Sequence, residues 1–120
     1  MAAGVSHTLP KAERLSGKTR ISALLTDGHS GTAGCLRYRY LADNGLAFSR
    51  ILISVPKRHF KRAVKRNFLK RRIREAYRLQ KERLGPGVDI LFVYLPREVV
   101  PYAALYADMT AVLDQVHAAL

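Results

Sequence analysis

The basic segment of residues 61–78, KRAVKRNFLKRRIREAYR, constrains the fold more than any other part of the chain. On an α-helix at about 100° per residue, its apolar residues and its cations fall on separate sides. An arc of about 100°, the width of a core-facing stripe, holds Leu69, Ile73, Ala76, Tyr77 and, beyond the segment, Leu84. A second arc that does not overlap the first holds Asn67, Lys70, Arg71, Arg74, Arg78 and Lys81. The pattern predicts a helix that lies on a sheet and presents cations on another side.

The charge of this region predicts a polyanionic partner. The formal net charge is +12, and thirteen of the 21 Lys and Arg residues lie between Lys57 and Arg83. Only Glu75 and Glu82 oppose them there. Solvated helix faces mix charges in stabilising i,i+4 pairs, whereas the cationic arc contains no acid. Because arginine, which binds phosphate bidentately, outnumbers lysine there, we expect a nucleic acid rather than an anionic membrane surface.

The remaining sequence predicts one sheet flanked by helices, an α/β sandwich. Hydrophobic spacing predicts a first helix over about 9–27, broken by a turn at 28–31, and a last helix over 101–120. Strands are expected in 35–41, 48–55 and 88–95, and the basic helix over about 62–84. At 120 residues the chain is expected to form a single domain over residues 1–120, with 1–8 a flexible tail.

Several functional classes find no support in the residues. Cys35 is the single cysteine, and the four histidines, His7, His29, His59 and His117, show no metal-ligand spacing. The nine carboxylates form no close pair suited to two-metal chemistry. There is no signal peptide or membrane-length apolar run. We therefore predict a soluble cytoplasmic protein that has no catalytic or metal-binding residues of its own.

The basic helix resembles a known signature. Residues 65–75 match the RNxxKRxxRE pattern, the RNR signature of the bacterial ribonuclease P protein subunit, with no spacing error. The matching residues are Arg66, Asn67, Lys70, Arg71, Arg74 and Glu75. Softer matches flank the signature in 54–58, 63–64 and 87–90, and Glu13-Arg14-Leu15 is similar to the family's first-helix region. The resemblance extends from about residue 9 to residue 116.

The resemblance implies a helix–three strands–helix–strand–helix order with a left-handed βαβ crossover. It also implies a protein that does not cut RNA itself: a catalytic RNA holds Mg²⁺, and the protein binds that RNA and the 5′ leader of precursor tRNA. By this resemblance the surface that binds the catalytic RNA comprises Arg66, Asn67, Lys70, Arg71 and Arg74, extended by Lys57, Arg58, Arg62 and Lys65. Arg66 lies off the cationic arc, so its role is expected to depend on the helix entry. The free chain is expected to be a monomer without a cofactor.

The family's leader cleft lies between its first helix and the sheet, where two phenylalanines are common. Their counterparts in this chain are Ile21 and Leu25, which stack poorly on bases. Tyr38 and Tyr40 are the alternative stacking residues, and packing in the core is the competing interpretation for both. A structural RNA-binding protein of the ribosome or of its assembly is the alternative function that charge and composition leave open.

Overall fold

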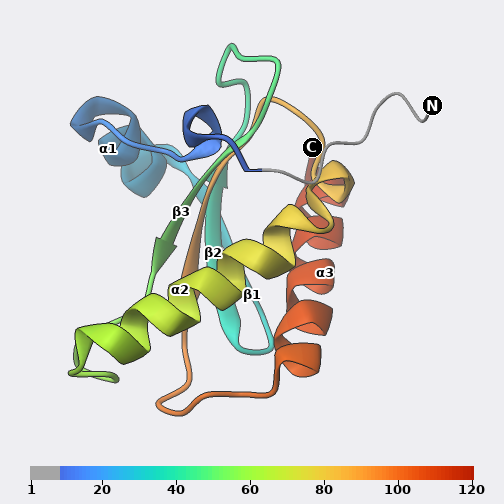
Figure 1. Ribbon diagram of the computed structural model, residues 1–120. Helices are drawn as coiled ribbons and strands as arrows, with labels where there is room; N and C mark the ends of the chain where they lie inside the picture. Colours follow the sequence, from blue (N-terminus) through green and yellow to red (C-terminus); the bar gives the residue numbers. More distant parts are fainter. Residues whose placement is uncertain (1–8) are drawn as a thin grey trace.

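The computed structural model describes residues 9–120, and the predicted tail of residues 1–8 lies outside them. A four-stranded sheet in the order β1-β2-β4-β3 forms the centre (Figure 1). The strands are β1 (His29–Ala33), β2 (Leu36–Leu41), β3 (Arg50–Ser54) and β4 (Asp89–Tyr94). The helices are α1 (Lys18–Asp27), α2 (Ala63–Arg78) and α3 (Tyr102–Ala119), with the short 3-10 helices η1 (Lys11–Glu13) and η2 (Lys81–Arg83).

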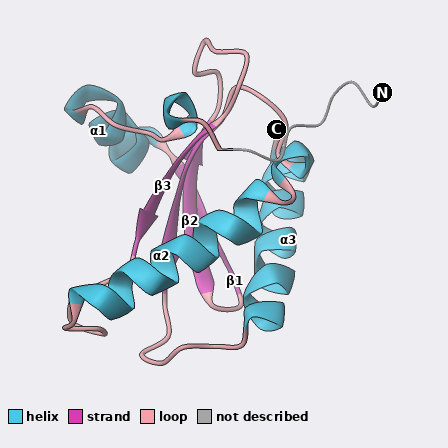
Figure 2. Cartoon of the chain, in the orientation of Figure 1, coloured by secondary structure: helices cyan, strands magenta, loops and turns pink. Residues whose placement is uncertain are grey.

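The helices lie on opposite faces of the sheet. In Figure 2, α2 crosses in front of the strands, with α3 to their right and α1 to their upper left. Two adjacent residues of β2 separate the faces, because Tyr38 donates to Gln115 of α3 and Arg39 donates to the Leu24 carbonyl of α1. The register of β2 and β4 pairs Tyr38 with Phe92, so both side chains point to the face under α2 and α3. Because successive residues of a strand alternate between faces, Arg39 and Asp89 point to the other face. That face, on which α1 lies, is the α1 face of the sheet.

The connection between β3 and β4 has an unusual hand. The two strands are adjacent and parallel, with residues 50–54 paired to residues 89–93, and α2 joins them. In Figure 1 both strands run downward, β4 lies to the right of β3, and α2 crosses in front of them. This crossover is left-handed, whereas about 98% of such connections are right-handed. The predicted sandwich and its left-handed crossover are confirmed.

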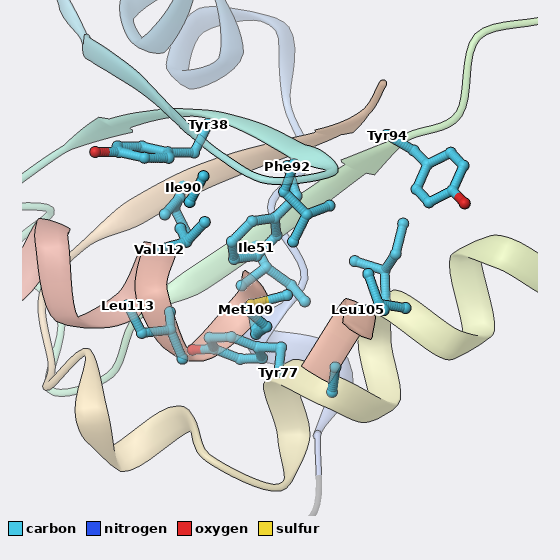
Figure 3. Close-up of a cluster of buried hydrophobic side chains, with 14 of the residues drawn as sticks. Tyr38, Ile51, Tyr77, Ile90, Phe92, Tyr94, Leu105, Met109, Val112 and Leu113 are labelled. Carbon is cyan, nitrogen blue, oxygen red and sulfur yellow. The ribbon is translucent and has the colours of Figure 1, made fainter. Parts of the chain in front are cut away.

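The core lies between the sheet and the pair α2 and α3. Figure 3 shows side chains of the sheet, among them Ile90 and Phe92, pointing toward Met109 of α3 and Tyr77 of α2. The Tyr77 and Phe92 rings lie 5.9 Å apart. All five residues of the predicted apolar arc are buried, namely Leu69, Ile73, Ala76, Tyr77 and Leu84. The sequence-based orientation of α2 is therefore correct.

The first helix is shorter than predicted. The Leu15 N–H donates to the Ile51 carbonyl of β3 at 2.7 Å, and Arg14 forms a parallel bridge with the same residue. Gly17 then adopts a φ of 95°, which an L side chain rarely adopts, and α1 begins at Lys18. Residues 14–15 are thus held extended on the outer edge of the sheet, and the prediction of a helix over 9–27 was wrong in its first half.

Residues 29–33 form strand β1, where the residue pattern predicted a turn. The strand sequence HSGTA contains no apolar alternation, and its pairing with β2 creates the strand. The pair closes through Gly34, at a φ of 55°, with Ala33 opposite Leu36. The three strands that the family resemblance implied before α2 are therefore present.

The basic helix ends about one and a half turns earlier than predicted, at Arg78 rather than near Leu84. Gln80 leaves the helical conformation at a φ of −142° and is buried. Its side chain accepts a hydrogen bond from the Thr110 hydroxyl at 2.6 Å and donates to the Tyr106 carbonyl at 3.3 Å. These bonds to α3 hold Gln80 outside the helix, and η2 follows.

Candidate nucleic-acid interface

A side of α2 distinct from its buried side carries the predicted cations. Asn67, Lys70, Arg71 and Arg74 form what we call the α2 cationic face, which is separate from the buried side of the helix. Asn67 and Arg71 are exposed, whereas Lys70 and Arg74 are half-buried. Burial in apolar contacts fixes the helix on one side, so the cations on the other side are held in place. The structure thus brings these four residues together as the sequence predicted.

Arg66 acts at the entry to the helix. Its Nη1 atom donates to the Phe60 carbonyl at 2.9 Å and to the Lys61 carbonyl at 2.8 Å. Phe60 is itself buried, with its ring 6.0 Å from that of Tyr94. Arg66 therefore fastens the loop that precedes α2 to the first turn of the helix. Arg66 lies off the cationic arc, and its contacts at the helix entry agree with the position expected for it from the sequence.

The other predicted cations surround this entry. Lys57 and Arg58 lie in the turn after β3, Arg62 is the residue before α2, and Lys65 is in its first turn. All four side chains are exposed. Together these entry cations continue the charge of the α2 cationic face beyond the start of the helix. A strand of nucleic acid at this end of α2 would meet cations from the turn after β3 to the α2 cationic face.

At the far end of α2, acids from outside the cationic arc pair with its cations. Glu75 binds Arg78 in a two-pronged ion pair, with both N–O distances at 2.8 Å. Lys81 donates to the Glu13 carboxylate at 3.0 Å. The hydrogen bonds from Arg78 lower the pKa of Glu75, so the carboxylate stays charged. The last two cations of the predicted arc are therefore paired, and the open positive charge lies nearer the start of the helix.

Arg14 is a further cation at this surface and lies outside the set of site residues predicted from the sequence. It lies with Arg71 and Arg74 in the lining of a hollow of about 710 Å³ over α2. It lies with Lys70 and Arg74 in the lining of a second hollow, of about 260 Å³, beside β3. Burial, together with the charges of Arg14 and Arg71, lowers the pKa of Arg74. The match of Glu13-Arg14-Leu15 to the family was the available signal.

The residues predicted for a leader cleft do not come together. Ile21 and Leu25 are on α1, and Leu25 is 53% exposed. Tyr38 and Tyr40 point to the opposite face, under α3, and each is only 8% exposed. The Tyr38 hydroxyl donates to Gln115 of α3 at 3.0 Å. The stacking role for the two tyrosines was wrong, and the competing interpretation, packing in the core, is correct.

The α1 face of the sheet carries arginines and aliphatic residues instead. Leu91 and Leu52 are neighbours there, and Arg39 lies opposite Leu91. The Arg39 Nε atom donates to the Leu24 carbonyl at 2.9 Å, which ties the sheet to α1. These side chains are half-buried and therefore partly accessible, and Leu25 of α1 is exposed.

A buried carboxylate fixes α1 against this face. Asp89, which has no exposed surface, accepts hydrogen bonds from Arg20 of α1, from Arg50 of β3 at 2.9 and 2.8 Å, and from Asn44 at 3.0 Å. Burial alone would raise the pKa of Asp89, but the bonds from Arg50, Arg20 and Asn44 outweigh it and lower the pKa. The charged network therefore determines where α1 lies relative to the strands.

Possible metal ligands and the Cys35 thiol lie among the described residues. Among residues 9–120, no three His, Cys, Asp or Glu side chains gather as metal ligands would. Burial and the neighbouring Asp108 raise the pKa of the Cys35 thiol to about 12, which leaves it unreactive at neutral pH. None of the helices in this range has the length and apolar character of a membrane span.

The fold and its surface define a small basic α and β protein whose central helix presents a cationic face. A comparison with protein families matches residues 9–117 to the family described as Ribonuclease P. The chain belongs to the ribonuclease P protein family.

Individual relatives agree with this assignment. The chain is 41% identical over 96 residues to the ribonuclease P protein component of Porphyromonas gingivalis. The matched region covers 78% of this chain and 70% of that protein. The RNase P protein from Thermotoga maritima has a similar structure, with a TM-score of 0.76 and 25% identity over 86% of this chain and 96% of that one. The Staphylococcus aureus RNase P protein, at 24% identity, shares the fold with a TM-score of 0.76, over 88% of this chain and 95% of that one.

Proposed function

We infer that this chain is the protein subunit of ribonuclease P, the ribonucleoprotein that removes the 5′ leader of precursor tRNA. The observation that carries the inference is the RNxxKRxxRE signature on the open side of α2, in a chain of this family. Basic charge alone is compatible with many RNA-binding proteins, whereas the signature supports the protein subunit of ribonuclease P. The alternative, a structural RNA-binding protein of the ribosome, has no comparable support among the family matches.

The catalytic RNA is the partner of the α2 cationic face. Cations about 5 Å apart along successive turns of a helix match the spacing needed to follow a phosphate backbone. Arg71 and Arg74 are suited to bidentate contacts with phosphate, and Lys70 supplies a point charge on the same face. Arg66 contributes by holding the entry loop, so that Lys57 and Arg58 continue the surface.

The chain binds and positions RNA rather than cutting it. In this proposal the Mg²⁺ ions that activate the attacking water are held by the catalytic RNA. The chain's cations neutralise phosphates where RNA strands approach one another, which stabilises the compact RNA at low magnesium. The support for this division is the character of the surface, which is cationic and built for contacts with backbone phosphates.

The 5′ leader of precursor tRNA is proposed to bind between α1 and the α1 face of the sheet. Ile21 and Leu25 offer apolar contact from the helix, and the strands offer the Arg39 cation and the apolar side chain of Leu91. Without an aromatic platform at Ile21 or Leu25, the leader is held by backbone charge and apolar contact more than by stacking. We further propose that the free chain is a monomer that acts in the bacterial cytoplasm.

Reconstitution tests the function directly. The purified chain is mixed with a bacterial ribonuclease P RNA and precursor tRNA at a magnesium concentration at which the RNA alone is slow. We expect faster cleavage at the mature 5′ end when the chain is present. Mature tRNA serves as the control for product inhibition, and a basic protein of similar charge serves as the control for unspecific charge neutralisation. Cleavage no faster than with RNA alone would reject the proposal.

A further inference from the structure

The hollow of about 260 Å³ beside β3 has a feature that the signature does not account for. Its cations come from two distant parts of the chain: Lys70 and Arg74 from α2, and Arg14 from the segment before α1. The remaining lining is apolar, from Leu15 and from residues 51–53 of β3, and contains no acid. Three cations thus converge over an apolar floor, and none of the three has a carboxylate in the lining to neutralise it.

The position of Arg14 is fixed by its backbone and by its neighbours. The parallel bridge to Ile51 and the Leu15 N–H bond to the Ile51 carbonyl attach the segment to β3. The ion pair between Glu13 and Lys81 holds the preceding residue, with both side chains about 15% exposed or less. In Figure 1 this dark-blue segment lies against the start of β3. Arg14 itself remains exposed, so the fold places a cation there without using its side chain for packing.

The edge of β3 adds hydrogen-bonding groups to the hollow. The Arg50 N–H donates to the Val88 carbonyl beside β4, while the Ile51 carbonyl accepts from Leu15 on the opposite side. Since N–H and C=O directions alternate along a strand, the Ile53 N–H and C=O point outward like those of Ile51. In the described part of the chain, β3 is the last strand on this side of the sheet. The edge therefore offers one backbone donor and one acceptor beside the three cations.

The cost of assembling these cations argues for an anionic ligand. Arg74 is half-buried, and burial together with the charges of Arg14 and Arg71 lowers its pKa. Like charges held this close repel one another, and a bound phosphate would relieve that repulsion. The volume is below the range of about 300–1,000 Å³ typical of pockets for drug-sized ligands, which suits a group no larger than one nucleotide.

We propose that Arg14, Lys70 and Arg74 clamp one phosphodiester of an RNA strand where that strand passes from α2 to the outer edge of β3. The inference rests on the proposed function and deepens it, because it assigns a binding role to a residue outside the signature. The backbone donor and acceptor of Ile53 lie where the sugar or base of the same nucleotide would pass. The strand belongs either to the catalytic RNA or to the leader, and the experiment separates the two sources.

The test measures the binding of variants as a function of salt concentration. Arg14→Gln removes the proposed contact, and Lys11→Gln is the matched control, since Lys11 is an exposed cation of η1 that lines neither hollow. The probes are a bacterial ribonuclease P RNA with the chain alone, and precursor or mature tRNA with the reconstituted holoenzyme. Thermal unfolding of each variant confirms that it is folded.

We expect Arg14→Gln to weaken binding about tenfold, as for one lost charge-assisted contact. The slope of log K against log salt should become shallower by about 0.7–0.9. Arg14→Lys should recover the slope, because it keeps the charge. The double variant Arg14→Gln/Arg74→Gln should lose less binding free energy than the two single variants together, because both residues contact the same phosphate.

The pattern of loss identifies the strand. If Arg14→Gln weakens binding of the chain to the catalytic RNA in the absence of tRNA, the phosphodiester belongs to that RNA. A loss confined to precursor tRNA in the holoenzyme, with mature tRNA unaffected, assigns it to the leader. If Arg14→Gln behaves as Lys11→Gln does in both arms, or if the double variant is strictly additive, the clamp is rejected. The proposed function still stands in that case if the unsubstituted chain binds and activates the catalytic RNA. If the unsubstituted chain does neither, the proposed function and the clamp are both rejected.

Discussion

Arg20 and Asp89 are 69 positions apart in the sequence, yet the Arg20 guanidinium donates to the Asp89 carboxylate where α1 meets the sheet. Arg50 binds the same carboxylate from β3, so one buried acid joins a helix and two strands. The placement of α1 thus depends on a charged network as well as on apolar packing, and the proposed leader-binding surface depends on that placement.

Substitution of this acid tests the network. Asp89→Asn removes the charge that pairs with two arginines, and we expect a loss of about 2–4 kcal/mol in the free energy of unfolding. Both arginines keep some access to water, at 28% and 22% exposure, which limits the loss. Urea unfolding measures it. Asp114→Asn is the control, because both side chains of the Asp114–Arg83 pair are exposed. This pair should contribute less than about 1 kcal/mol to the free energy of unfolding.

The same carboxylate predicts how stability depends on pH. The pKa of Asp89 is lower in the folded chain than the ordinary value of about 3.9, so folding favours its charged form. Its contribution is therefore fully present above about pH 4 and is lost as the pH falls through the folded pKa. We expect the free energy of unfolding to fall less steeply on acidification in Asp89→Asn than in the unsubstituted chain. An equal acid-induced fall in both proteins would show that Asp89 does not titrate as its contacts imply.

The sorting of α2 into two sides is the part of the fold that the sequence predicted best. A 3.6-residue period is visible in Leu69, Ile73 and Tyr77 whatever the helix packs against, because side chains on one face of a helix recur at that spacing. The left-handed crossover, by contrast, came from the family resemblance. No residue pattern in the segment distinguishes the two hands.

The errors have a common cause, which is that tertiary contacts decided the local structure. Leu15 has helical spacing with later residues, yet it pairs with the edge of β3 and is extended. The strand HSGTA exists because β2 pairs with it. Tyr38 and Tyr40 share one face because side chains alternate along a strand, but alternation does not show whether α1 or α3 covers that face. Arg14 was missed for the same reason, since its neighbours Arg74 and Lys70 are close only in the folded chain.

Substitution on the α2 cationic face tests the site. Arg71→Ala is expected to weaken binding to a ribonuclease P RNA and to flatten its salt dependence by about one counterion. Arg71 is exposed, so the free energy of unfolding should change by less than about 0.5 kcal/mol. Arg97→Ala is the matched control, because Arg97 is an exposed cation in the loop between β4 and α3. Equal salt slopes for the two variants would place the RNA elsewhere.

Substitution on the buried side of α2 should give the opposite result. Ile73 has no exposed surface, and Ile73→Ala leaves a cavity under the helix that we expect to cost about 2–5 kcal/mol of stability. In the fraction that remains folded, the salt slope of RNA binding should be unchanged, because no cation is lost. Urea unfolding and binding on the same preparation check both points. A stable Ile73→Ala variant with weakened RNA binding would contradict the assignment of the two sides.

Leu25 allows a test of the proposed leader surface by gain of function. The side chain is 53% exposed on α1, so a larger residue fits there without disturbing the core. Leu25→Phe supplies an aromatic platform, and stacking of one leader base on it is expected to strengthen binding by about 1–3 kcal/mol.

Affinity of the holoenzyme for precursor tRNA should therefore rise, while affinity for mature tRNA, which has no leader, stays the same. Leu46→Phe is the control, since Leu46 is an exposed leucine, at 38%, in the loop between β2 and β3. If Leu25→Phe and Leu46→Phe change precursor binding equally, the leader does not pass over α1. If precursor and mature tRNA gain equally, the added ring contacts the tRNA body instead of the leader.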